Sequence, residues 1–148
     1  MIKYTDSSVV FEEIPDRVTL AFSISNCQNN CIGCHSAFLR QNIGTIMTKE
    51  HLVEKYDKEL KLCNCFLLLG EGNDREALFE ISDFIKEKYN IETAIYSGRP
   101  QVEDEFYKRF DFVKIGPYMA DRGPLNKETT NQQLFYHGDD ITYKFWKR

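Results

Sequence analysis

The sequence predicts an α/β protein with a mostly parallel sheet that is covered by helices. Four strand-like runs, residues 18–24, 63–69, 90–96 and 112–117, are each followed by turn-forming residues. Helical stretches separate these runs, and the connections are long enough for right-handed crossovers between parallel strands. Four core strands are too few to close an eight-stranded barrel, so the length of the chain favours a partial, open barrel.

The first half of the chain supplies the first strands and one long helix. Residues 8–15 form a short extended segment, expected as an edge strand or flap, that ends at Pro15. Residues 18–24 alternate in apolar character, which predicts a strand, and residues 37–41 predict a short helical turn. Residues 48–60 open with a capping threonine and place apolar side chains at helical spacing, which predicts an amphipathic helix on the sheet.

The second half repeats strand and helix. Residues 63–69 resemble a strand buried on both faces. Cys63 and Cys65 would point to the same face of this strand, where both would act as small buried hydrophobic residues. Residues 75–89 follow an Asn-Asp start and predict a strong helix. A further helix is expected through Val102, Phe106 and Phe110, between the third and fourth core strands.

The last third of the chain is richer in turns. Residues 134–136 and 141–146 flank His137-Gly138-Asp139-Asp140, which predicts a C-terminal β-hairpin. The loop 118–126 and the polar stretch Thr130-Asn131-Gln132 are candidates for the rim of an open barrel. The equal alternative is a surface loop packed on its own sheet.

Length and composition restrict the class of protein. The 148 residues, of which 42% are hydrophobic, suffice for a single domain, residues 1–148, with a real core. The net charge of -4 argues against a nucleic-acid groove or an anionic membrane surface as the main partner. No apolar run reaches transmembrane length, and the five unevenly spaced cysteines are no disulfide framework, so we expect a cytoplasmic protein.

The most distinctive feature is the cysteine segment directly after the first core strand. Cys27, Cys31 and Cys34 are spaced C-x3-C-x2-C among asparagine, glutamine and glycine residues that allow tight wrapping of the chain. A structural zinc site needs four protein ligands, whereas a cubane iron-sulfur cluster held by three cysteines leaves one iron open to another ligand. Three cysteines therefore favour a reactive 4Fe-4S cluster.

Other interpretations of the cysteines remain open. Cys31-Ile32-Gly33-Cys34-His35 fits the haem c attachment pattern, although that haem belongs to exported proteins and the chain starts with no signal peptide. A zinc site could use the three cysteines with His35, Cys63 or Cys65, although no second ligand pair has the usual spacing. A dithiol pair of Cys31 and Cys34 would leave Cys27 unexplained.

A second candidate site follows the 63–69 strand. Gly70-Glu71-Gly72 is a glycine-rich turn at the C-terminal end of an expected parallel strand, where such folds bind ligands. A plain strand-to-helix turn is the alternative, because short glycine motifs are weak signals alone.

These residues together resemble a known family. The spacing Cys27-x3-Cys31-x2-Cys34 after a first strand resembles the signature of the radical S-adenosylmethionine (SAM) enzymes. The short chain, the run Gly33-Cys34-His35-Ser36 and the later Thr130-Asn131-Gln132 resemble the anaerobic ribonucleotide reductase activating proteins, which are glycyl-radical-enzyme activases. Gly70 and Glu71 match the family's Gly-Gly-Glu stretch in part, since Leu69 stands in place of the first glycine.

The resemblance implies a fold, cofactors and site residues. The fold would be a partial, open radical SAM β/α barrel. Cys27, Cys31 and Cys34 would bind a 4Fe-4S cluster whose open iron binds SAM. The residues implied at the SAM site are Gly33, His35, Gly70, Glu71 and Ser97. No side chain is expected to act as acid, base or nucleophile, because the cluster and SAM generate the radical.

The resemblance also implies an activity and partners. The protein would be an oxidoreductase that removes a hydrogen atom from a glycine of a glycyl radical enzyme, with anaerobic ribonucleotide reductase, through its large subunit, as the expected partner. A flavodoxin or ferredoxin would donate electrons, and neither nucleic acid nor membrane is an expected partner. Two other classes remain: a zinc-binding interaction module built on the cysteine segment, and an electron carrier that keeps the cluster without SAM.

Overall fold

The structure is a computed structural model that describes residues 1–25, 44–117, 119–123, 125 and 127–146. The cysteine segment, with Cys27, Cys31, Gly33, Cys34 and His35, lies outside the described residues, as does the helical turn predicted at 37–41.

The described residues form one open sheet of eight strands in the order β3-β1-β2-β4-β5-β6-β7-β8. The sequence-based prediction of an α/β fold is confirmed, and all four expected core strands are present as β2, β4, β5 and β6. The strand bounds are β1 Ile2–Val10, β2 Thr19–Ile24, β3 Thr45–Met47, β4 Cys65–Leu69, β5 Glu92–Tyr96, β6 Phe112–Ile115, β7 Gln133–Tyr136 and β8 Asp139–Asp140.

Parallel pairing is confined to the centre of the sheet. The pairs β2–β4, β4–β5 and β5–β6 are parallel, whereas β1–β2, β1–β3, β6–β7 and β7–β8 are antiparallel. The expectation of a mostly parallel sheet is therefore wrong for the sheet as a whole. Residues 11–18, which join β1 to β2, are too few for the crossover of about a dozen residues that a parallel pair requires, so this pair forms a hairpin.

The three described helices begin and end near the predicted positions. They are α1 Lys49–Leu62, α2 Arg75–Tyr89 and α3 Asp104–Arg109. The Thr48 side chain caps α1 by accepting a hydrogen bond from His51 N at 3.0 Å, and Asp74 caps α2 by accepting from Ala77 N at 3.1 Å. At the end of α2, Asn90 adopts a left-handed conformation with φ of 55°.

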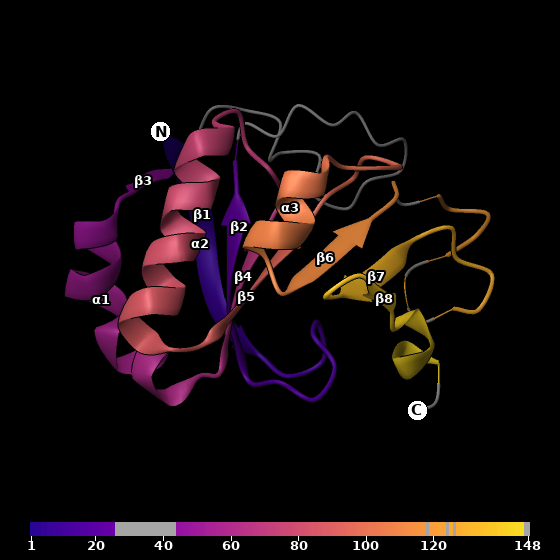
Figure 1. Ribbon diagram of the computed structural model, residues 1–148, viewed down its shortest axis with the longest axis horizontal. Helices are drawn as coiled ribbons and strands as arrows, with labels where there is room; N and C mark the ends of the chain where they lie inside the picture. The colour runs from indigo at the N-terminus through magenta and orange to yellow at the C-terminus, as the bar shows by residue number, and fades with distance from the viewer. Residues whose placement is uncertain (26–43, 118, 124, 126, 147–148) are drawn as a thin grey trace.

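The helices α1, α2 and α3 all cover the same face of the sheet (Figure 1). Every second residue of the core strands points toward them, as strand geometry requires. Burying each of these side chains contributes about 1.5–3 kcal/mol. The strand residues of this larger core cluster include Leu20, Phe22, Ile24, Phe66, Leu68, Ile95, Val113 and Ile115, and the helical residues include Leu52, Leu60, Leu78, Ile85 and Phe106.

The opposite face is covered differently. Ala21, Leu67 and Ala94 form a second apolar cluster there with Ile14 from the β1–β2 connection and with residues of the C-terminal region. Among the described residues, the only helical segment on this face is one short 3₁₀ segment. In the described part of the chain, the long helices therefore lie on one face of the sheet only.

A C-terminal β-hairpin is present, but its second strand, β8, lies at Asp139–Asp140, in the predicted turn, and the strand predicted at residues 141–146 is wrong. β7 and β8 pair through a turn in which His137 and Gly138 have φ of 49° and 89°, as a two-residue hairpin turn with positive φ requires. The chain then forms a 3₁₀ helix, η2 Thr142–Phe145, where a strand was expected. The Asp140 carboxylate accepts hydrogen bonds from Thr142 N at 2.9 Å and Thr142 Oγ1 at 2.6 Å, and this turns the chain away from the ladder.

In the part of the chain that the structure describes, no helix combines the length and the apolar character needed to cross a bilayer.

Candidate functional site

The C-terminal ends of the four parallel strands lie at one edge of the sheet. Because β2, β4, β5 and β6 are parallel and adjacent, Ile24, Leu69, Tyr96 and Ile115 end their strands at this edge. The segment that contains Cys27, Cys31 and Cys34 in the sequence follows β2 directly, after Ser25. The glycine-rich turn follows β4 at the same edge.

The turn after β4 lies against the end of β2. Gly70 has φ of +117° and Gly72 has φ of +65°, and both values disfavour residues with a side chain. A Cβ at Gly70 would lie 3.3 Å from Ile24 O, and a Cβ at Gly72 would lie 3.1 Å from Ile24 Cγ2. Both glycines are therefore required where this turn approaches the strand that leads into the cysteine segment.

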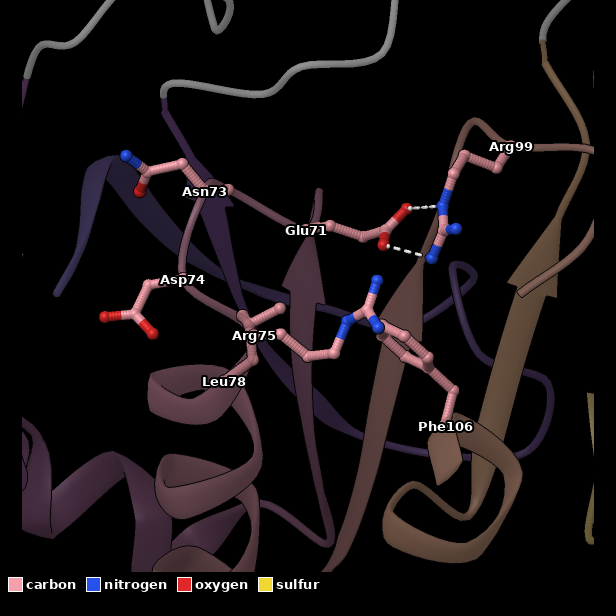
Figure 2. A pocket seen from close by; sticks show the side chains of 8 residues that line it. Glu71, Asn73, Asp74, Arg75, Leu78, Arg99 and Phe106 are labelled. Atoms are coloured by element: carbon pink, nitrogen blue, oxygen red, sulfur yellow. Dashed lines mark hydrogen bonds and ion pairs between the residues drawn. The ribbon is translucent and has the colours of Figure 1, made fainter. Parts of the chain in front are cut away.

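The Glu71 side chain reaches across to the turn after β5 (Figure 2). Its Oε1 accepts a hydrogen bond from Arg99 Nη2 at 2.7 Å, and its Oε2 accepts one from Arg99 Nε at 3.0 Å. The hydroxyl of Ser97, which is fully buried, also donates to Glu71 Oε2. Two of the predicted site residues, Glu71 and Ser97, are thus brought into direct contact.

Arg99 extends this contact toward α3. Its guanidinium also donates to both carboxylate oxygens of Glu103, at 2.9 and 2.8 Å, and Glu103 in turn pairs with Arg75 at 3.0 Å. Hydrogen bonds from Arg99 are the main cause that lowers the pKa of Glu103 to about 2. The pKa of Arg99 is raised by the hydrogen bonds to Glu103 and Glu71. The four side chains form an alternating ion-pair chain.

A pocket of about 220 Å³ borders this ion-pair chain (Figure 2). Glu71 and Arg99 form one side, and the start of α2 forms another. Its apolar wall consists of Leu78 and Phe106, which belong to the core cluster under the helices. The pocket therefore opens on the helix-covered side of the turn after β4.

A buried lysine lies at the end of β6. Lys114 Nζ donates to Ser97 O at 3.1 Å and to Gly116 O at 3.2 Å, and it lies 5.5 Å from the centre of the Tyr96 ring. A buried ammonium group needs such partners, since an unpaired one would be very costly. Lys114 was missed at the sequence level, although a single lysine within the apolar run Phe112–Ile115 was a usable signal.

The polar stretch Thr130-Asn131-Gln132 packs on the same edge. Asn131 Nδ2 donates to Pro117 O at 3.0 Å and Gln132 Nε2 donates to Gly116 O at 3.4 Å. A Cβ at Gly116 would lie 3.0 Å from Asn131 O, so the two segments are in close contact. These contacts agree equally with the predicted rim and with its alternative, a surface loop packed on its own sheet.

Cys63 and Cys65 do not share a face, contrary to the sequence-based expectation. Cys63 follows α1 and belongs to the core under the helices, whereas Cys65 starts β4 and belongs to the opposite cluster. Burial raises the pKa of the Cys65 thiol to about 12 and also raises that of Cys63, which disfavours the reactive thiolate form in both. Cys65 pairs with Thr19 at the start of β2, whereas Cys27 is only two residues along the chain from Ser25 at the other end of β2, which argues against Cys65 as a fourth zinc ligand.

In the described residues, one group of three potential metal ligands occurs, at the other edge of the sheet. Glu92, Asp111 and His137 place ligand atoms within 4.8 Å of one another. Glu92 accepts hydrogen bonds from Arg17 Nε and from Tyr136 OH, both at 2.5 Å, and Asp111 pairs with His137 at 3.1 Å. Each of the three side chains therefore has a polar partner within the protein.

The structure therefore brings together Gly70, Glu71 and Ser97 among the predicted site residues, while Gly33, His35 and the three cysteines lie outside the described residues. Arg99 was missed. Arg99 lies two residues after Ser97, in the turn after β5, and β5 is the neighbour of β4, the strand that precedes Glu71. This position was the signal in the sequence.

Comparisons with protein-family models, with curated proteins and with solved structures found no match to this chain.

The lowered pKa of Glu103 leads to a prediction on acid stability. A carboxylate whose pKa is lower in the folded than in the unfolded chain stabilises the fold above the unfolded pKa, and this contribution is lost as pH falls through the folded pKa. We expect the free energy of unfolding to fall between pH of about 4.5 and about 2, and to fall less steeply in Glu103→Gln. Urea unfolding at a series of pH values measures this, and equal slopes for both proteins would contradict the assignment.

Proposed function

We propose that the protein is a radical SAM activase that uses a 4Fe-4S cluster and SAM to form a glycyl radical on a partner enzyme. The observation that supports this most is the contact of Gly70 and Gly72 with Ile24. It joins the turn implied in SAM binding to the strand end from which the three-cysteine segment departs.

The described residues fit such a group at this edge. Gly70 and Gly72 have positive φ values, lie close to Ile24 and carry no side chains. On both sides of Glu71 the turn therefore consists of backbone alone. Glu71 adds a carboxylate and Ser97 a hydroxyl from the adjacent turn. Cys27, Cys31 and Cys34 would hold the cluster, and Gly33 and His35 would lie next to it in the chain.

When bound, the cluster and SAM supply one-electron cleavage of SAM to methionine and a 5′-deoxyadenosyl radical. The protein's own contribution is binding, orientation and exclusion of water. Gly70 and Glu71 would hold the amino end of SAM through the backbone and the carboxylate, and Ser97 would fix the Glu71 carboxylate. No described side chain needs to act as acid, base or nucleophile.

The position of all three described α-helices on one face of the sheet supports the barrel interpretation. In a β/α barrel the helices lie outside and the ligands bind at the C-terminal ends of the strands. Here α1, α2 and α3 cover one face, and β2, β4, β5 and β6 are parallel. We propose that these four strands with their helices are a partial, open radical SAM barrel, to which the antiparallel strands at both edges are additions.

The proposed partner is a glycyl radical enzyme, most specifically the large subunit of anaerobic ribonucleotide reductase, with a flavodoxin or ferredoxin as electron donor in the cytoplasm. The partner glycine would have to reach the C-terminal ends of the parallel strands, where Gly70, Glu71 and Ser97 would hold SAM, and the bound cofactors would supply the removal of its Cα hydrogen.

Reductive cleavage of SAM tests this proposal. The protein is reconstituted anaerobically with iron and sulfide, reduced with dithionite and incubated with SAM, and 5′-deoxyadenosine is quantified by chromatography. We expect it to form only with both reductant and SAM present. Stable binding of one zinc ion with no SAM cleavage would favour the zinc-binding interaction module instead.

A further inference from the structure

Arg99 and Glu71 form a pair of hydrogen bonds at the strand ends. Two parallel N–H···O bonds between a guanidinium and a carboxylate fix both the distance and the orientation of the two groups. The Glu71 side chain is 13% exposed and that of Arg99 is 30% exposed, so solvent screens this pair less than a surface pair.

Arg99 also links the ends of three strands. Its backbone N–H donates to Ser97 Oγ at 3.0 Å, and its carbonyl oxygen accepts from Gly116 N at 2.6 Å, after β6. Its side chain reaches the turn after β4 through Glu71. Arg99 therefore connects the turns that follow β4, β5 and β6.

The turn that Arg99 contacts contains two glycines, which gives its backbone an intrinsically wide choice of conformations. Gly70 and Gly72 have access to many backbone conformations, and a ligand that bound a mobile turn would have to order it at a cost in affinity. The Glu71 carboxylate is one residue from each glycine, so holding it in place would limit the arrangements open to the turn before a ligand binds.

We propose that Arg99 is a positioning residue that preorganises the Gly70-Glu71-Gly72 turn for SAM. This inference rests on the proposed function. Arg99 acts through Glu71, and its removal lowers the affinity for SAM while it leaves the cluster in place.

The test compares Arg99→Met with Arg109→Met in the full chain, reconstituted anaerobically. Arg109 is a matched control, because it also pairs with two carboxylates, Glu105 and Asp83, and lies 5.3 Å from the centre of the Phe79 ring, as Arg99 lies 5.7 Å from that of Phe106. Among the described residues, its side chain forms its ion pairs with α2 and α3 and not with the strand-end turns. Equilibrium dialysis with labelled SAM gives the dissociation constant, and iron analysis gives the cluster content.

We expect Arg99→Met to bind SAM about tenfold more weakly at unchanged iron content, which is the size of effect seen when a supporting hydrogen-bond partner of a bound group is removed. Arg109→Met should stay within about twofold of the parent. Arg99→Lys, which keeps the charge without the paired geometry, should recover part of the loss.

Unchanged SAM affinity in Arg99→Met would overturn the inference and leave the proposed function intact. If Arg99→Met does not fold, Glu71→Gln removes the same paired contact from the other side, and normal SAM affinity in that variant would overturn it equally. A parent protein that holds the cluster but binds no SAM would contradict the proposed function itself.

Discussion

Replacement of Cys34 by alanine is expected to abolish the bound cluster and SAM cleavage. A cluster held by three thiolates has no spare protein ligand, so the loss of one leaves two irons without a cysteine. Removal of a residue that only hydrogen-bonds to a metal ligand lowers metal affinity or activity about 10- to 100-fold. Removal of a ligand itself should therefore lower the activity at least about a hundredfold. Iron and sulfide analysis after anaerobic reconstitution, together with the yield of 5′-deoxyadenosine, measures it.

Cys63→Ala is the matched control for this experiment. Cys63 is a buried free thiol in the core under the helices, and burial raises its pKa. Its replacement should change the stability slightly and leave the iron content unchanged. If Cys34→Ala retained the cluster and SAM cleavage, or if Cys63→Ala lost them, the ligand assignment to Cys27, Cys31 and Cys34 would be wrong.

Among replacements of the glycines that the structure describes, Gly44→Ala is expected to have the largest effect on stability. Gly44 directly precedes β3 and has φ of +105°. A Cβ there would lie 2.2 Å from Tyr4 O and 2.7 Å from Tyr4 C, both backbone atoms of β1 that cannot move without breaking the sheet. Backbone strain and steric overlap each cost about 1–3 kcal/mol, so we expect a loss of about 4 kcal/mol in the free energy of unfolding.

Gly138→Ala separates the two contributions to this loss. Gly138 also has a positive φ, +89°, but nothing lies within 4 Å of a Cβ built there. Its replacement should therefore cost only the conformational strain, about 1–3 kcal/mol. Urea unfolding of both variants measures the difference, and an equal loss in the two would show that the contact between Gly44 and Tyr4 is not as close as described.

The local features of the fold were predictable from the sequence. The strong helix expected at residues 75–89 has those bounds, because Asp74 caps its start and its apolar residues recur at helical spacing. The four core strands were predictable because each is a short apolar run bounded by turn-forming residues.

The pairing of distant segments was not predictable in the same way. β1 lies between β2 and β3 rather than at an edge, and this depends on which strands meet, which periodicity does not encode. Strand order also decides the site: Glu71 and Arg99 are 28 residues apart and meet only because β4 and β5 are neighbours. Cys63 and Cys65 were assigned to one face because a strand was assumed at Cys63, where α1 has just ended.

Low-temperature EPR of the reconstituted, dithionite-reduced protein, recorded with and without SAM, tests the central proposal most directly. The proposal predicts the signal of a reduced 4Fe-4S cluster whose shape changes when SAM is added, because SAM binds the open iron that three cysteines leave. A cluster signal that SAM leaves unchanged would indicate an electron carrier. A diamagnetic protein with one tightly bound zinc ion would contradict the proposal and make the chain an interaction module.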